Sequence, residues 1–173
     1  MSVVRHALSI DETRANFERV KWGVIGDEPA RVAGELERFE QVWFAGNHSD
    51  VGGSYREDES RLSDIALHWL LGEATDALHP IRVDRMKLHL YPAVAGPQDC
   101  QVEMLRDGYP NWWPKTLRES WPSKPRVIHA GAVLHPSVLR RFELVTVLQH
   151  GIPRPYRPTS LRHHRDLQQF YTD

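Results

Sequence analysis

The chain has 173 residues, which is enough for one globular domain and too few for two of ordinary size. Its 22 lysines and arginines nearly balance its 23 aspartates and glutamates, so the composition gives no electrostatic reason to expect a nucleic-acid partner. Cys100 is the single cysteine, which excludes an intrachain disulfide and a zinc ribbon and fits a reducing compartment.

The N-terminal segment argues against a signal peptide or a membrane anchor. No apolar run approaches the roughly 18 residues of a membrane span. Charged side chains also occupy the region where a signal peptide is apolar, namely Arg5, Asp11, Glu12 and Arg14. We therefore expect no transmembrane segment and a cytoplasmic location, with secretion through a contact-dependent apparatus left open because that route uses no cleaved signal.

The first elements predicted along the chain are a helix, a loop and a strand. Residues 2–19 carry spaced apolar side chains among charges and predict an amphipathic helix capped by Ser2. Glycines and a proline break this spacing and predict a loop over residues 23–37. The segment FEQVWFAG, residues 39–46, ends in a continuous apolar run that favours a strand buried on both faces, as in a parallel sheet covered by helices.

The middle of the chain begins with the strongest helical pattern and then weakens. Apolar residues recur at helical spacing from about residue 60 to the His79-Pro80 pair, where the helix should end. Residues 86–91, MKLHLY, predict a strand, and residues 101–107 predict a helical turn. Residues 108–125, rich in proline and tryptophan, predict an ordered irregular loop.

The last predicted helix covers residues 135–148 and has Pro136 at its first position. An irregular tail follows it. One strong strand and two weaker ones are too few for a complete doubly wound sheet, because a strand buried on both faces needs strand neighbours. We therefore expect an α/β fold with an incomplete, mostly parallel sheet and flanking helices.

The loop GNHSDVGGSY, residues 46–55, carries the candidate chemistry. It follows the predicted strand, and functional groups in open α/β sheets gather beyond the carboxyl ends of strands. His48 is a candidate general base, and Asp50 is either its orienting acid or a carboxylate that fixes the loop. Hydrogen bonding of both side chains to the loop backbone alone is the competing interpretation.

Two other residues, Ser49 and His135, are candidates for the same chemistry. Ser49 is adjacent to His48, and adjacent side chains in an extended segment point in opposite directions, so we do not expect Ser49 to be the nucleophile. The Gly-x-Ser-x-Gly elbow of serine hydrolases is absent from the 173 residues. His135 is an alternative base, although its position before a helix also suits a cap.

A metal site is the other alternative for these residues. His48, Asp50 and His135 match the two-histidine, one-carboxylate set of non-haem iron sites. The predicted helices do not indicate the β-rich barrel that usually carries such a site. We therefore expect no cofactor and no metal.

Five segments resemble, in the same order, a family of α/β-hydrolase-like domains, long listed as of unknown function, that includes the catalytic domain of type VI secretion phospholipase effectors. The resemblance implies a serine hydrolase acting on ester bonds, with phospholipids as substrates of the effector members. It spans nearly the whole chain, roughly residues 3–161. The segments are RHALSIDETRANF (5–17), QVWFAGNHSDVGGSY (41–55), LSDIALHWLLGEA (62–74), HPSVLRRF (135–142) and YRPTSL (156–161).

The resemblance also implies that part of the domain is absent from these 173 residues. The family's nucleophile elbow and an Asp-Thr-Val segment that is a candidate for its acid lie upstream of the motif matched by residues 5–17; if that Asp is the acid, Asp50 is structural. Residues 1–161 are thus expected to be the second half of such a domain, and residues 162–173 a C-terminal tail. By position, His48 is the first choice for the base, Asp50 its orienting acid or a structural carboxylate, and His135 the alternative base.

The leading hypothesis is therefore a truncated or split ester hydrolase that is inactive alone. Its expected partner is the missing N-terminal half as a separate chain, and its expected substrate when complete is a lipid or another ester. The competing hypothesis is non-catalytic: a gene remnant or a binding module that keeps part of the fold.

Overall fold

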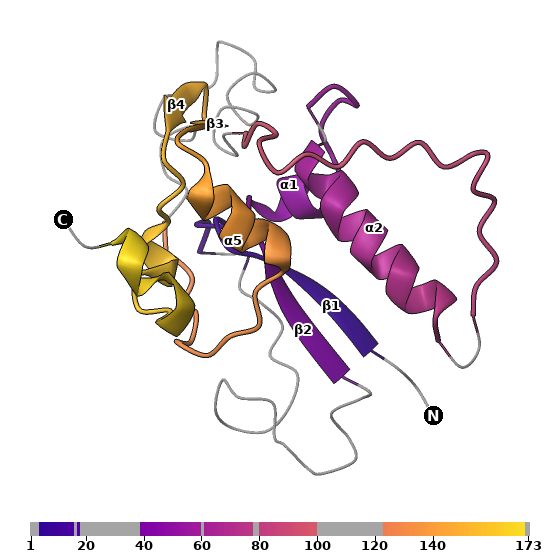
Figure 1. The fold of residues 1–173 in the computed structure, drawn as a ribbon, viewed down its shortest axis with the longest axis horizontal. Coiled ribbons are helices and arrows are strands. Elements are labelled where there is room, and N and C mark those ends of the chain that lie inside the picture. Colours follow the sequence, from indigo (N-terminus) through magenta and orange to yellow (C-terminus); the bar gives the residue numbers. More distant parts are fainter. Residues whose placement is uncertain are drawn as a thin grey trace.

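The computed structural model describes residues 4–15, 17, 39–59, 61–77, 80–99 and 123–171. Its centre is a parallel pair of strands, β1 (Val4–Ser9) and β2 (Phe39–Phe44), which run side by side from the Val4 and Phe39 pair to the Ser9 and Phe44 pair. In Figure 1, α2 (Arg61–Thr75) and α5 (Pro136–Glu143) lie on opposite sides of these strands.

The two faces of the sheet are covered by separate apolar clusters. Leu8 and Trp43 pack with side chains of α5 and of the C-terminal segment, which contributes Tyr156 among others. Val42 and Phe44 pack with side chains of α2 on the other face. Neighbouring residues of a strand point to opposite faces, so β2 is buried on both. The strand predicted at residues 39–46 and its two-sided burial are confirmed.

A short segment pairs with the other edge of β2. The backbone amide of Trp43 donates to the carbonyl of Val133 at 2.9 Å, and the amide of His135 donates to the carbonyl of Trp43 at 2.9 Å. Trp43 and Leu134 thereby form a parallel bridge. β2 therefore has a neighbour on each side, and the added segment leads directly into α5.

The helix predicted over residues 2–19 is wrong, since residues 4–9 form β1. Ala7 and Leu8 pack into the two different clusters, as the alternation of a strand requires and a helical stripe does not allow. Pairing with β2 continues past the strand end, where the amide of Ile10 donates to the carbonyl of Phe44. A distant partner thus overrides the local apolar spacing.

The helix predicted from about residue 60 is confirmed as α2, but it ends at Thr75 and not at the His79-Pro80 pair. The strand predicted at residues 86–91 is wrong: Met86 and Tyr91 are largely exposed, and the amide of Tyr91 donates to Asp64 of α2 instead of to a neighbouring strand. The loop predicted at 23–37, the helical turn at 101–107 and residues 108–122 of the Pro- and Trp-rich loop lie outside the described residues.

The last predicted helix is shorter than residues 135–148, because α5 ends at Glu143. Strands β3 (Val147–Gln149) and β4 (Ile152–Arg154) follow as an antiparallel hairpin. His150 and Gly151 join them with φ of 53° and 75°, the backbone that a two-residue hairpin turn needs. The 3-10 helices Thr159–Leu161 and Arg165–Phe170 complete the cover of α5.

The described residues thus form a mixed α/β structure with a small parallel sheet and flanking helices. This confirms the α/β class. None of the helices described is long and apolar enough to cross a membrane.

Candidate functional site

The loop after β2 is shaped by Gly46 and by a reciprocal helix cap. Gly46 has a φ of 105°, and a Cβ at this position would lie 2.3 Å from Cβ of Asp50, so a side chain has no room. The next residue, Asn47, caps the short helix α1 (His48–Gly52) by accepting from the amides of Ser49 and Asp50 at 2.8 and 3.1 Å. Asp50 in turn accepts from the amide of Asn47 at 2.8 Å, which completes a capping box.

Asp50 is buried and is bound by backbone amides on both of its oxygens. Besides the amide of Asn47, it accepts from the amide of Asp99 at 3.3 Å. Burial raises the pKa of Asp50 to about 7, and the charges of Asp99 and Asp11 add to this effect. These contacts are those of a carboxylate that fixes the loop; its role as orienting acid of His48 stays a prediction.

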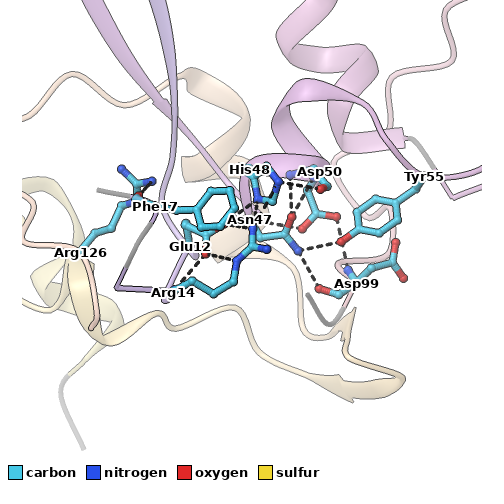
Figure 2. Close-up of polar contacts among 10 residues, drawn as sticks. Glu12, Arg14, Phe17, Asn47, His48, Asp50, Tyr55, Asp99 and Arg126 are labelled. Carbon is cyan, nitrogen blue, oxygen red and sulfur yellow. Dashed lines mark hydrogen bonds and ion pairs between the residues drawn. The ribbon is translucent and has the colours of Figure 1, made fainter. Parts of the chain in front are cut away.

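The carboxylate that contacts His48 is Glu12, which follows β1 (Figure 2). Its Oε2 lies 2.7 Å from Nδ1 of His48, and its side chain has no solvent exposure. Arg14 binds the same carboxylate through two hydrogen bonds: Nε donates to Oε1 at 3.0 Å and Nη2 donates to Oε2 at 2.9 Å. Burial alone would raise the pKa of Glu12, but the hydrogen bonds from Arg14 and His48 outweigh it and the pKa is lowered.

Sequence reasoning missed Glu12 because residues 2–19 were predicted to be helical. The signal is present once β1 is recognised: Glu12 follows the carboxyl end of one parallel strand and His48 the carboxyl end of its neighbour, so both belong to the same edge of the sheet.

The imidazole of His48 is partly open to solvent, with 41% of its side chain exposed. The ring of Phe17 lies against it with a centroid distance of 4.9 Å, and the guanidinium of Arg14 lies 3.7 Å from the centroid of Phe17. Nη2 of Arg14 also contacts Nδ1 of His48. One side of the ring is therefore held by Glu12, Arg14 and Phe17 (Figure 2).

Ser49 lies next to the other ring nitrogen, which corrects the expectation that it points away. Its Oγ is 3.2 Å from Nε2 of His48. The reason is local: His48 and Ser49 open the helix α1, and successive side chains in a helix are about 100° apart rather than on opposite faces.

His135 is a helix cap in a different environment. Its Nδ1 accepts from the amide of Ser137 at 3.2 Å at the start of α5, and its ring stacks on Phe44 at a centroid distance of 4.6 Å. Burial lowers the pKa of His135, and the charges of Arg140 and His68 act in the same direction. The cap contacts fit the structural interpretation, and its role as alternative base stays a prediction.

The residues of the metal alternative are not gathered into a site. In the described ranges, no group of three or more His, Cys, Asp or Glu side chains is placed to hold a metal ion. His48, Asp50 and His135 each have the separate hydrogen-bond partners given above.

A cavity of about 480 Å³ lies beside the loop, and Asp11, Thr13 and Asn47 are among the residues that line it. The side chains of Gln98 and Asp99 also line it, and each has a buried oxygen without a hydrogen-bond partner. Asn47, the residue before His48, connects this wall to the loop, because its Nδ2 donates to the carbonyl of Asp99 at 3.0 Å. The cavity therefore lies next to the loop that carries His48 and has these polar groups in a wall that also contains apolar side chains.

Comparison with known proteins supports the resemblance for the first part of the chain. The family described as T6SS, Phospholipase effector Tle1-like, catalytic domain matches residues 1–73, a stretch that contains Glu12, His48 and Asp50. A segment of 37 residues is 49% identical to the uncharacterized protein YEL023C of Saccharomyces cerevisiae; it covers 20% of this chain and 5% of the yeast protein. No solved structure matches the chain.

Proposed function

We propose that this chain contributes the general-base side of a serine ester hydrolase, with His48 as the base. The observation that carries the proposal is the state of the His48 ring at the carboxyl end of β2. A buried carboxylate lies against Nδ1, and the side chain is partly exposed. An imidazole whose Nδ1 is held in this way can take a proton at Nε2 from the hydroxyl of a nucleophile.

The family match supports ester chemistry at this position. It covers the loop that contains His48, and the relatives it describes are phospholipase effectors. On this basis the substrate is a lipid or another ester, and the cavity beside Asn47 has room for part of it.

The nucleophile in this proposal comes from outside the 173 residues, which contain no Gly-x-Ser-x-Gly segment. A separate N-terminal half is the partner that would supply it. His48 alone cannot form the acyl intermediate, because the members of a catalytic triad act as a unit. The chain alone should therefore be inactive.

A second candidate function is an active site within the chain, with Ser49 as the nucleophile. The distance of 3.2 Å between Ser49 Oγ and His48 Nε2 favours it. Two features weigh against it. Ser49 is only 6% exposed, and Oδ1 of Asn47 already occupies the amides of Ser49 and Asp50, which leaves those two donors unavailable to a developing oxyanion.

Labelling with a fluorophosphonate separates the two functions. The chain alone should stay unlabelled, whereas co-expression with the polypeptide encoded immediately upstream should give a labelled serine on that partner and hydrolysis of a short-chain ester. Label on this chain that disappears in Ser49→Ala would support the second function. A stable complex that neither labels nor hydrolyses esters would support the non-catalytic hypothesis.

A further inference from the structure

We infer that Glu12 is the positioning carboxylate of His48, in the role that the sequence suggested for Asp50. The inference rests on the proposed function of His48 as a base. It is carried by the distance of 2.7 Å between Glu12 Oε2 and His48 Nδ1 and by the complete burial of the Glu12 side chain.

The two carboxylates of the site have different partners and different charge states. Asp50 uses its oxygens to accept from the backbone amides of Asn47 and Asp99, which keeps the loop in shape. Its raised pKa also makes it only partly ionised near neutral pH. Glu12 has a lowered pKa and is ionised, so it is a permanent acceptor beside the ring.

An ionised carboxylate accepts hydrogen bonds and cannot donate them. Nδ1 of His48 must therefore carry a hydrogen when it faces Glu12, and in the neutral ring Nε2 is then the unprotonated nitrogen, with Ser49 Oγ at 3.2 Å and Arg14 Nη2 at 3.3 Å. A general base needs this tautomer, because it receives the proton of the nucleophile at Nε2. Glu12 thus acts on the reaction through His48 and not on the substrate.

Arg14 could make Nδ1 of His48 a hydrogen-bond acceptor, the opposite of the donor role that Glu12 requires. A guanidinium only donates, so a hydrogen bond from Nη2 to Nδ1 would require the other tautomer. Arg14 is, however, bound to Glu12 at three points: Nε and the backbone amide donate to Oε1 at 3.0 and 2.9 Å, and one hydrogen of Nη2 is directed at Oε2 at 2.9 Å. The second hydrogen of Nη2 is not committed to Nδ1, because Nη2 also lies 3.3 Å from Nε2. We assign Arg14 to holding the carboxylate, and its closeness to the ring follows from their shared contact with Oε2.

Glu12 and Arg14, as alternative partners of His48, predict different ¹⁵N signals for Nδ1. In spectra of the full-length chain labelled with ¹⁵N-histidine, Nδ1 of the neutral His48 ring should be protonated and Nε2 should not. A hydrogen bond to a charged acceptor favours this tautomer by about tenfold or more. The His48 signals are identified by their loss in His48→Gln. A bare Nδ1 with a protonated Nε2 would make Arg14 the partner and overturn the inference.

Matched carboxyl-to-amide variants test which acid sets the tautomer. Glu12→Gln should reduce the preference for protonated Nδ1, and Asp50→Asn should leave it in place. The reverse result would assign the role to Asp50 and overturn the inference. If Glu12→Gln does not fold, Glu12→Asp is the alternative, because it keeps the charge and moves it away from the ring by one methylene. An unchanged preference for protonated Nδ1 in Glu12→Asp would also contradict the role of Glu12.

The measurement is independent of ester hydrolysis. A complex that shows protonated Nδ1 but no hydrolysis would remove the proposed function and leave the orientation of His48 by Glu12 standing. Hydrolysis by a complex in which Nδ1 is unprotonated would support the proposed function and overturn the role of Glu12.

Discussion

Asn47 and Asp50 cap each other: each side chain accepts a hydrogen bond from the other residue's backbone amide, at 3.1 Å for Asn47 Oδ1 and 2.8 Å for Asp50 Oδ2. Nδ2 of Asn47 also donates to Tyr55 Oη and to the carbonyl of Asp99, so one side chain connects the helix start to two other segments.

Asn47→Ala should therefore lower the free energy of unfolding by more than the loss of an ordinary helix cap does. A lost cap costs about 1 kcal/mol of unfolding free energy, and the two donated hydrogen bonds add to this value. Asn47→Ser keeps a capping oxygen and loses the two donors, so its unfolding free energy in urea should lie between wild type and Asn47→Ala. Equal values for the two variants would contradict the capping role.

Gly46 and Gly52 provide a matched pair of glycines at the two ends of the loop. Gly46→Ala should destabilise the protein by more than about 1 kcal/mol, because its φ is positive and its Cβ would overlap Asp50. A Cβ on Gly52 has nothing within 4 Å, so Gly52→Ala should be neutral or stabilise by up to about 1 kcal/mol. Urea denaturation of both variants checks this; equal losses would contradict the loop geometry.

Asp50 should make stability depend on pH. Its pKa is raised from 3.8 to about 7, so the folded state binds the proton more tightly than the unfolded state. Its contribution to stability is present below pH 3.8 and is lost as pH rises through about 7. Thermal unfolding should show wild type losing stability relative to Asp50→Asn across this window. Parallel curves for the two proteins would contradict the burial of the Asp50 charge.

His135 should give the opposite pH dependence. Its pKa is lowered below 6.5, so the unfolded state binds the proton more tightly. The contribution of neutral His135 is present above pH 6.5 and is lost as pH falls below it. His135→Asn keeps a capping side chain without a titrating ring. Wild type should therefore lose stability relative to this variant on acidification, and a constant difference would contradict the lowered pKa of His135.

The parts predicted from the sequence are those that local pattern determines. The apolar end of residues 39–46 and the helical spacing after residue 60 identify β2 and α2, and the loop between them places His48 at a strand end. β1 was missed because its strand character comes from pairing with β2, which is distant in sequence.

The error in β1 also concealed the acid of the site. Glu12 contacts His48 only because two parallel strands bring their carboxyl ends together, and no local pattern around either residue carries that information. Ser49 was placed on the wrong side for a different, local reason: its direction follows from the helical turn of α1, which begins one residue earlier.

The most direct test of the account is the rate of ester hydrolysis by this chain co-expressed with a nucleophile-bearing partner. His48→Gln should lower kcat by about three orders of magnitude or more, as expected when one member of a triad is removed. His135→Asn should stay close to the wild-type rate. Activity that survives His48→Gln and is lost in His135→Asn would contradict the assignment of His48 as the base.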